Sequence, residues 1–344
     1  MATRALVTGG CGFIGSNFVR HLLREEPDVL VTNLDLLTYA GNPRNLEDVA
    51  DSPDYQFVRG DIRDAQAVAE LVADADWIVN FAAESHVDRS LGEKAGAFVD
   101  TNVYGVWCLL EALRVADRGA RFLQVGTDEV YGSLPQGGAS ESALPVPTSP
   151  YAASKAGGDQ IALAFWRTHG RDVIVSRCTN NYGPYQYPEK LVPLFITNAL
   201  DREPLPLYDG GGQVRDWLRV EDHCRALLLM LRAGSAGEIY NVGACQDPEW
   251  SNRALTELIL RCAGASEDLI RPVDGLRPGH DERYAVDTTK IRGLGWTPER
   301  PLEQGVADTV SWYAEHRDWW QPLKSGEYRA FYEKHYGAAL RARR

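Results

Sequence analysis

The sequence lacks the patterns that mark metal centres and disulfide frameworks. Its six cysteines are dispersed, and no two of them are spaced as C-x-x-C. No H-E-x-x-H motif or similar histidine cluster is present either. Because closely spaced Cys and His residues are typical of metal and redox sites, we expect buried, reduced cysteines and no bound metal.

Long apolar runs and an excess of basic residues are also missing. No run approaches the roughly 18 apolar residues that a membrane-spanning helix needs. The chain carries 36 basic and 48 acidic residues, a net charge of −12, which disfavours binding of nucleic acid through bulk electrostatics. The residues Ala2–Thr8 are typical of a first strand rather than of a secretory signal. We therefore expect a cytoplasmic protein that binds neither nucleic acid nor a membrane.

The first half of the chain predicts an α/β fold. With 344 residues, 44% of them hydrophobic, the chain can bury the core of one large or two unequal domains. Short apolar runs predict strands at 5–8, 30–34, 55–59, 77–80, 121–125 and 172–177. Helical periodicity lies between them at 14–24, 64–73, 102–116 and 151–169. This alternation predicts a Rossmann-type, doubly wound parallel sheet with helices on both faces.

The rhythm changes after about Arg177. Several prolines and the run Gly210–Gly212 indicate loops and short helices, and the tail from Pro298 is helical and rich in aromatic residues. A helix near 221–231 and a strand at 238–242 resemble the first half again. We expect a first domain of residues 1–178 with later contributions from about 215–242. Residues 179–214 and 243–344 should form a smaller, interleaved C-terminal α/β substrate lobe.

A glycine-rich turn follows the first predicted strand. Gly9, Gly12 and Gly15 are spaced as G-x-x-G-x-x-G and open a helix, so the backbone and the helix N-terminus can approach a pyrophosphate. Asp35 ends the second predicted strand, 20 residues after Gly15, where a carboxylate can bind ribose hydroxyls. Its charge would repel a 2′-phosphate at about 4 Å by a few kcal/mol. The pattern predicts bound NAD rather than NADP.

Five residues carry the candidate chemistry. Tyr151 and Lys155 are one helical turn apart, so the ammonium would lie beside the phenol and lower its pKa. In this arrangement Tyr151 would remove a hydroxyl proton while hydride leaves the same carbon. Thr127 could donate to a substrate oxygen. Asp128 and Glu129 follow the fifth strand, and neighbouring carboxyls can split into one acid and one base, as water elimination beside a ketone requires.

At this point the sequence resembles the nucleotide-sugar 4,6-dehydratases of the extended short-chain dehydrogenase/reductase family, specifically those that act on dTDP-glucose. The resemblance runs nearly end to end. It is carried by segments 9–16, 37–42 (L-T-Y-A-G-N), 82–90, 127–132 (T-D-E-V-Y-G), 151–155, 180–191 (N-N-Y-G-P-Y-Q-Y-P-E-K-L), 215–217, 277–281 and 324–326, together with Asp35.

The resemblance implies a redox-neutral dehydration that yields a 4-keto-6-deoxy sugar. Tyr151, tuned by Lys155, would oxidise the sugar at C4, and hydride would move to bound NAD. Glu129 would then take the C5 proton, Asp128 would protonate the departing C6 hydroxyl, and the hydride would return to C6. Thr127 would polarise the C4 oxygen.

The resemblance also assigns binding residues and an assembly. Besides the glycines, the implied NAD contacts are Phe13, Ile14, Asp35, Thr38, Asp61, Ile62, Ala82, Ala83, Thr101, Tyr151, Lys155 and Asn181. The implied nucleotide-sugar contacts are Ser85, Thr127, Asn180, Lys190, Leu191, Pro206, Tyr208, Arg215, Asn252 and His280. The family forms homodimers through a four-helix bundle. In this chain the helices would be 102–116, with Val103, Val106, Trp107, Leu110 and Leu113, and 151–169. Both apolar stripes could instead be internal core.

Two departures and three alternatives remain open from the sequence. Leu36 stands where the family usually has Lys, and Gly126 where it usually has Ser. The chain could be another nucleotide-sugar enzyme of this fold, a UDP-glucose 4,6-dehydratase or a 4-epimerase. It could also be a catalytically silent NAD-binding protein, although such a protein has no need for all four of Tyr151, Lys155, Asp128 and Glu129.

Overall fold

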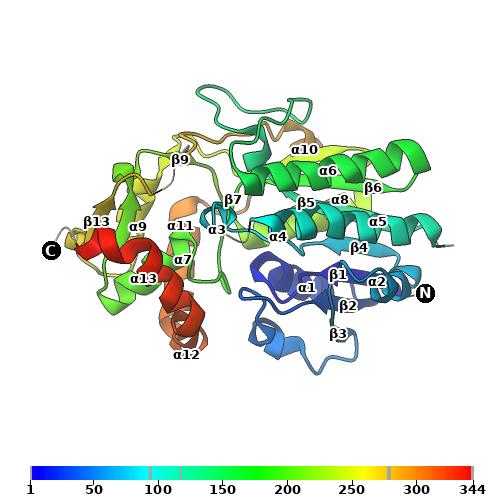
Figure 1. The fold of residues 1–344 in the computed structure, drawn as a ribbon, viewed down its shortest axis with the longest axis horizontal. Coiled ribbons are helices and arrows are strands. Elements are labelled where there is room, and N and C mark those ends of the chain that lie inside the picture. Colours follow the sequence, from blue (N-terminus) through cyan, green and yellow to red (C-terminus); the bar gives the residue numbers. More distant parts are fainter. Residues whose placement is uncertain (1, 93–94, 117, 277–279, 342–344) are drawn as a thin grey trace.

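A seven-stranded, wholly parallel sheet forms the centre of the first half of the chain (Figure 1). The computed structural model describes residues 2–92, 95–116, 118–276 and 280–341. In spatial order the strands are β11 (Ile239–Val242), β6 (Val173–Cys178), β5 (Arg121–Thr127), β4 (Trp77–Asn80), β1 (Thr3–Thr8), β2 (Val29–Asp35) and β3 (Tyr55–Arg59). The predicted doubly wound α/β fold is confirmed.

Helices cover both faces of this sheet because its strands alternate their apolar side chains between two cores. Ala5 and Val7 of β1 pack in the core under α1 (Phe13–Glu25) and α8 (Val220–Ala233). Leu6 points to the opposite core, under α2 (Ala65–Ala73), α5 (Val106–Val115) and α6 (Pro150–His169). Burial of both faces explains why the strands are almost uninterrupted apolar runs in the sequence.

The predicted helix 102–116 is longer and less regular than its periodicity indicated. It begins as α4 (Gly96–Val99), continues through a π-helical segment (Asp100–Gly105) and becomes α5. The π segment turns Thr101 toward the cavity described below. Apolar spacing does not reveal one extra residue in a turn, so the sequence could not show this change, and such segments often occur at functional sites.

A second group of elements lies beside the carboxyl ends of the central strands, on the left of Figure 1. It contains three two-stranded sheets: β7 (Asn180–Tyr182) with β10 (Trp217–Arg219), β8 (Leu205–Tyr208) with β13 (Ile270–Val273), and β9 (Val214–Arg215) with β12 (Trp250–Ser251). Around them pack α7 (Leu191–Asp201), α9 (Asn252–Cys262), α11 (Leu302–Glu315), α12 (Arg317–Trp320) and α13 (Gly326–Arg341). Their shared core includes the fully buried Trp320 and Tyr313.

The remaining elements are short. They are the helices α3 (Val87–Ser90) and α10 (Thr289–Gly293) and several 3₁₀ turns. Residues 277–279 of the quoted segment 277–281 lie outside the described residues. Within the described ranges, no helix is both long and apolar enough to cross a membrane.

Candidate active site

One cavity of about 550 Å³ opens at the carboxyl ends of β1, β2, β4, β5 and β6. Every residue proposed above for catalysis, for NAD or for the nucleotide sugar lines this cavity. Parallel strands end at the same edge of a sheet, which brings together the residues that follow the central strands, and the second group of elements supplies others, such as Pro206, Asn252 and His280. The structure therefore brings the whole predicted set together, although the sequence alone could not show that they share one space.

The glycine turn between β1 and α1 packs so closely against neighbouring backbone that two of its positions have no room for a side chain. Gly9 has φ 72°, and a Cβ there would lie 2.6 Å from the Ala82 nitrogen. A Cβ on Gly15 would lie 2.4 Å from the Gly9 carbonyl oxygen. The backbone of this turn can thus approach a pyrophosphate closely, with the first turn of α1 directed at it. The residues present fit a dinucleotide.

We expect Gly15→Ala to release the cofactor. The methyl group must push the turn at Gly9 away from the helix, an overpacking that costs typically about 1–3 kcal/mol. The measurement is the NAD content of the purified variant together with its thermal unfolding temperature. Gly96→Ala is the control, because a Cβ at Gly96 meets nothing within 4 Å. An NAD content equal to that of the control would contradict this account of the turn.

Asp35 is held beside the glycine turn by two backbone donors. Its Oδ2 accepts from the Cys11 N–H at 2.9 Å and its Oδ1 from the Leu37 N–H at 2.8 Å. Burial raises the pKa of Asp35, while both hydrogen bonds favour the ionised form. Leu36 lines the cavity, and its side chain is 40% exposed. Because leucine is uncharged, this side chain supplies no cation for a 2′-phosphate. This arrangement supports the predicted preference for NAD.

Asp61 lies at the same end of the cavity but is already bound to a cation. Arg63 donates to its Oδ2 through Nη2 at 2.6 Å, and this interaction lowers the pKa of Asp61. The sequence reading missed Arg63, which also lines the cavity. Arg63 could have been predicted as a cavity residue from its position two residues after Asp61, just past the end of β3.

The two acidic residues follow a strand that is longer than predicted. β5 continues to Thr127 because Gly126 and Thr127 pair with Arg177 and Cys178 of β6. A 3₁₀ turn (Asp128–Tyr131) begins there. The Thr127 hydroxyl accepts the Glu129 N–H at 3.3 Å, which fixes the start of that turn.

Asp128 and Glu129 have different environments. Asp128 is 2% exposed, and burial, followed by the charge of Glu129, raises its pKa well above the ordinary value. Glu129 is less buried. A carboxyl that keeps its proton beside one that is more open to water is the division expected for a general acid and a general base.

Tyr151 and Lys155 lie on α6, whose start is capped by the Ser149 hydroxyl accepting the Ala152 N–H at 3.1 Å. The lowering of the Tyr151 pKa that Lys155 was expected to cause is not the dominant effect on this phenol in the structure. Burial and the charge of Glu129 raise the pKa of Tyr151 well above 10. The Lys155 ammonium donates to the Val125 carbonyl at 2.6 Å, and burial lowers its own pKa.

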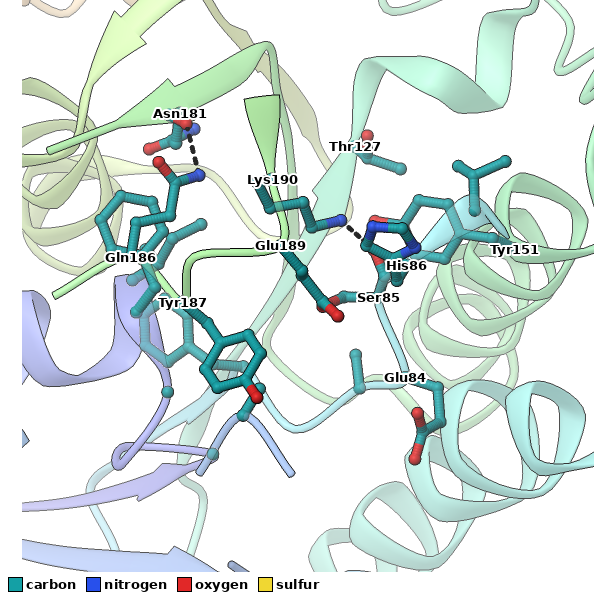
Figure 2. A pocket seen from close by; sticks show the side chains of 18 of the residues that line it. Glu84, Ser85, His86, Thr127, Tyr151, Asn181, Gln186, Tyr187, Glu189 and Lys190 are labelled. Carbon is teal, nitrogen blue, oxygen red and sulfur yellow. Dashed lines mark hydrogen bonds between the residues drawn. The ribbon is translucent and has the colours of Figure 1, made fainter. Parts of the chain in front are cut away.

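The substrate candidates line the cavity from both groups of elements, and Figure 2 shows Ser85, Thr127 and Lys190 among them. Lys190 Nζ donates to the Ser85 carbonyl at 2.6 Å, and Gln186 Nε2 donates to the Asn181 carbonyl at 3.0 Å. The guanidinium of Arg215 donates to the carbonyls of Val214 and Asp281 at 2.7 and 2.8 Å. These main-chain contacts place both cations at the cavity wall, where they can face a diphosphate.

Sequence reasoning missed a second cluster at this wall, centred on Glu189. The Tyr39 hydroxyl donates to Glu189 Oε1 at 2.8 Å, and Arg89 Nε lies 3.1 Å from Oε2. The Arg89 guanidinium also lies 3.7 Å from the centre of the Tyr39 ring. The three residues belong to three of the quoted segments. Because these segments carry the family resemblance, the cluster could have been predicted from them, as Lys190 and Leu191 were.

Comparison with known proteins identifies the family. The family model described as GDP-mannose 4,6 dehydratase matches residues 6–309. A dTDP-glucose 4,6-dehydratase from Streptomyces niveus is 54% identical over 327 residues, which cover 94% of this chain and 96% of the relative. This chain belongs to the dTDP-glucose 4,6-dehydratase family.

Solved structures separate this dehydratase family from others of the same fold. The crystal structure of the dTDP-glucose 4,6-dehydratase DesIV from Streptomyces venezuelae, with NAD and TYD bound, is similar with a TM-score of 0.90 and 52% identity. It covers 94% of this chain and 100% of its own. A UDP-glucose 4-epimerase from Thermus thermophilus, solved with NAD, has a TM-score of 0.83 and 30% identity over 91% of this chain and 100% of its own. The higher identity supports the dehydratase reading over the epimerase alternative.

Proposed function

We propose that this protein is an NAD-dependent dTDP-glucose 4,6-dehydratase, a hydro-lyase that converts dTDP-glucose to dTDP-4-keto-6-deoxyglucose. One observation carries the proposal: Asp128 and Glu129 line the same cavity as Tyr151 and Lys155. A simple dehydrogenase needs only the tyrosine and lysine, whereas elimination of water needs an acid and a base as well.

NAD would lie between the glycine turn and α6. The turn of Gly9 to Gly15 would hold its pyrophosphate and Asp35 a ribose, with Lys155 at the far end near the nicotinamide ribose. When bound, NAD takes hydride from C4 of the sugar and returns it to C6, so it ends each cycle in its starting form. The other cofactor candidates named from the sequence line the cavity between these points.

The chain's own residues would move three protons. Tyr151 takes the proton of the C4 hydroxyl, with Thr127 hydrogen-bonded to that oxygen. Glu129 takes the proton at C5, which is acidic beside the C4 ketone, and C5 regains a proton when the hydride returns to C6. Asp128, whose pKa is raised by burial, gives its proton to the C6 hydroxyl so that it departs as water. Each role matches the local environment: a base near solvent and a protonated, buried acid.

The nucleotide diphosphate would bind across the second group of elements. Lys190 and Arg215 would face the diphosphate, and the remaining substrate candidates would contact the base and sugars. This supports the proposed division into an NAD-binding domain (1–178, with part of 215–242) and a nucleotide-sugar lobe (179–214 and 243–344). A cytoplasmic location remains a prediction from the sequence.

The test is turnover of dTDP-glucose labelled with deuterium at C4. We expect the label in the new C6 methyl group, because the same hydride leaves C4 and returns to C6. Product mass and NMR spectra locate it. An epimerase would give no 6-deoxy ketone, and a silent protein would give no product. A product without label at C6 would show that the hydride does not return as proposed. UDP-glucose run in parallel reports the preference for the base.

We also propose a homodimer through the exposed part of the predicted helix 102–116, which keeps Trp107 of the sequence stripe but not its buried members. Val106, Leu110 and Leu113 are fully buried within one chain and cannot face a partner. Tyr104 and Trp107 instead remain 49% and 39% exposed, with their rings stacked 5.6 Å apart. Exposed, neighbouring aromatic residues on one helix are typical of protein interfaces.

Tyr104→Glu combined with Trp107→Glu should convert the dimer to a monomer, because two charges would be buried at its centre. Sedimentation velocity measures the assembly state. Leu144→Glu, at a residue 83% exposed, is the control and should leave the dimer intact. If the double variant remains dimeric, the interface lies elsewhere.

A further inference from the structure

A fully buried ion pair lies behind the cavity, at the second turn of α6 after Tyr151. Asp159 of α6 and Arg177 of β6 are 0% and 1% exposed, and Arg177 Nε lies 2.9 Å from Asp159 Oδ2. Neither residue lines the cavity formed by the described residues. Buried ion pairs contribute little net stability, because desolvation offsets their attraction. The presence of this pair therefore needs another explanation.

The acid of this pair lies one turn after Lys155 on the same helix, α6. Tyr151, Lys155 and Asp159 are spaced by four residues along α6, so they share one face, with neighbouring Cβ atoms about 5–6 Å apart. Lys155 Nζ donates to the Val125 carbonyl of β5. Both Asp159 carboxylate oxygens lie 3.1–3.2 Å from where a Cβ on Gly126, the next residue of β5, would sit. The two charges thus lie against consecutive residues of one strand.

Arg177 joins this face of α6 to the turn that carries the acid and the base. Its guanidinium carbon lies 4.9 Å from the centre of the Tyr131 ring, in the turn that begins at Asp128. Among the described residues, Asp159 Oδ1 has no hydrogen-bond partner. Apart from Arg177 Nε, no hydrogen-bond donor of the described residues shares the negative charge of the Asp159 carboxylate. That charge therefore acts strongly on the neighbouring groups.

We propose that Asp159, kept ionised by Arg177, is a positioning residue that keeps Lys155 in its charged ammonium form. The inference rests on the proposed function, because it assumes that this ammonium serves Tyr151. Burial favours the neutral amine and lowers the pKa of Lys155, and the Asp159 charge acts in the opposite direction. Burial likewise raises the pKa of Asp159, and Arg177 opposes that effect.

The other titratable groups around Lys155 do not replace Asp159. Burial raises the pKa of Cys178 on β6 to about 12, so this thiol is neutral at ordinary pH. Burial also raises the pKa values of Tyr151 on α6 and of Asp128 beyond β5, which disfavours a negative charge on either group in the free protein. Glu129 lies in the same turn as Asp128, at the cavity end, and its charge acts on Tyr151 and Asp128.

The test removes both charges of the pair at once, so that no buried charge is left alone. In the NAD-loaded protein, ¹³C-lysine NMR follows the titration of Lys155, which is one of six lysines and is assigned with Lys155→Arg. In Asp159→Asn/Arg177→Met we expect the Lys155 midpoint to fall, but by less than the roughly one to three pH units that follow loss of an opposite charge alone, because the positive charge of Arg177 is lost as well.

The control is Arg121→Met/Asp172→Asn. This pair (2.9 Å) joins the starts of β5 and β6, at the end of the strands away from the cavity. It should leave the Lys155 midpoint unchanged.

Turnover gives a second reading. In Asp159→Asn/Arg177→Met, the fall of kcat at alkaline pH should begin at a lower pH. KM should stay constant, because neither residue lines the cavity. An unchanged Lys155 midpoint in a folded variant would overturn the proposal. Failure of this variant to fold, with the control pair folded, would assign the pair to stability and also overturn it. Lack of turnover in the unsubstituted protein would count instead against the proposed function, because the NMR titration does not depend on activity.

Discussion

Tyr151→Phe should abolish oxidation of the sugar at C4 while leaving NAD bound. The substitution removes only the hydroxyl, so the ring can keep its edge contact with Phe98, 6.3 Å away between ring centres. Without a base at the C4 hydroxyl, we expect a loss of about 10²–10⁴-fold, the usual contribution of a positioned proton acceptor. Rapid mixing with dTDP-glucose, followed by the absorbance of reduced nicotinamide, measures this step.

The control for this variant is Tyr240→Phe. Tyr240 is also buried, but its hydroxyl accepts the Ser235 N–H at 3.0 Å, away from the cavity. Its turnover should remain close to that of the unsubstituted protein. Wild-type rates in Tyr151→Phe would mean that another group removes the proton, and a loss of NAD would mean that the hydroxyl serves binding rather than chemistry.

Glu129→Gln should separate oxidation from elimination. The amide has nearly the same shape but cannot accept the C5 proton, so exchange of solvent deuterium into C5 should fall by about 10²–10⁴-fold. Oxidation at C4 does not use this group and should continue reversibly. Mass spectrometry of recovered substrate in D₂O measures the exchange.

Asp128→Asn provides the comparison, because it changes the neighbouring carboxyl in the same way. This variant keeps the base and loses the acid, so deuterium should still enter C5 while loss of water slows and reduced nicotinamide accumulates. If Glu129→Gln kept the deuterium exchange and Asp128→Asn lost it, Asp128 would be the base and Glu129 the acid. Unchanged kinetics in both would remove the carboxyls from the mechanism.

Elements with a regular pattern could be predicted from the sequence. The parallel strands are recognisable because both faces of the sheet are buried, which makes each strand a short apolar run. The glycine turn and the Tyr151–Lys155 spacing are equally local. Since parallel strands end at one edge, the candidates that follow the central strands could be expected near that edge, whereas the contribution of the second group of elements to the same cavity could not.

Properties that depend on tertiary surroundings could not be predicted. Spacing placed Lys155 beside Tyr151 but could not show that its ammonium contacts the Val125 carbonyl, or that burial dominates the tyrosine's pKa. The same limit applies to Arg89 and Glu189, which are 100 residues apart in the chain and pair only after folding. Burial of the α5 stripe likewise depends on how much of it the chain's own sheet covers.

The chain leaves the central sheet for the second group of elements, returns to the sheet, and then enters the second group again. After β6 it forms β7 to β10, returns through α8, and places β11 at the edge of the central sheet, beside β6. A single cut near residue 180 would therefore remove a layer that packs on α1 and the outermost strand of the sheet. Recombination between relatives could exchange the nucleotide-sugar half only through more than one junction, so cofactor and substrate halves of this architecture should be inherited together.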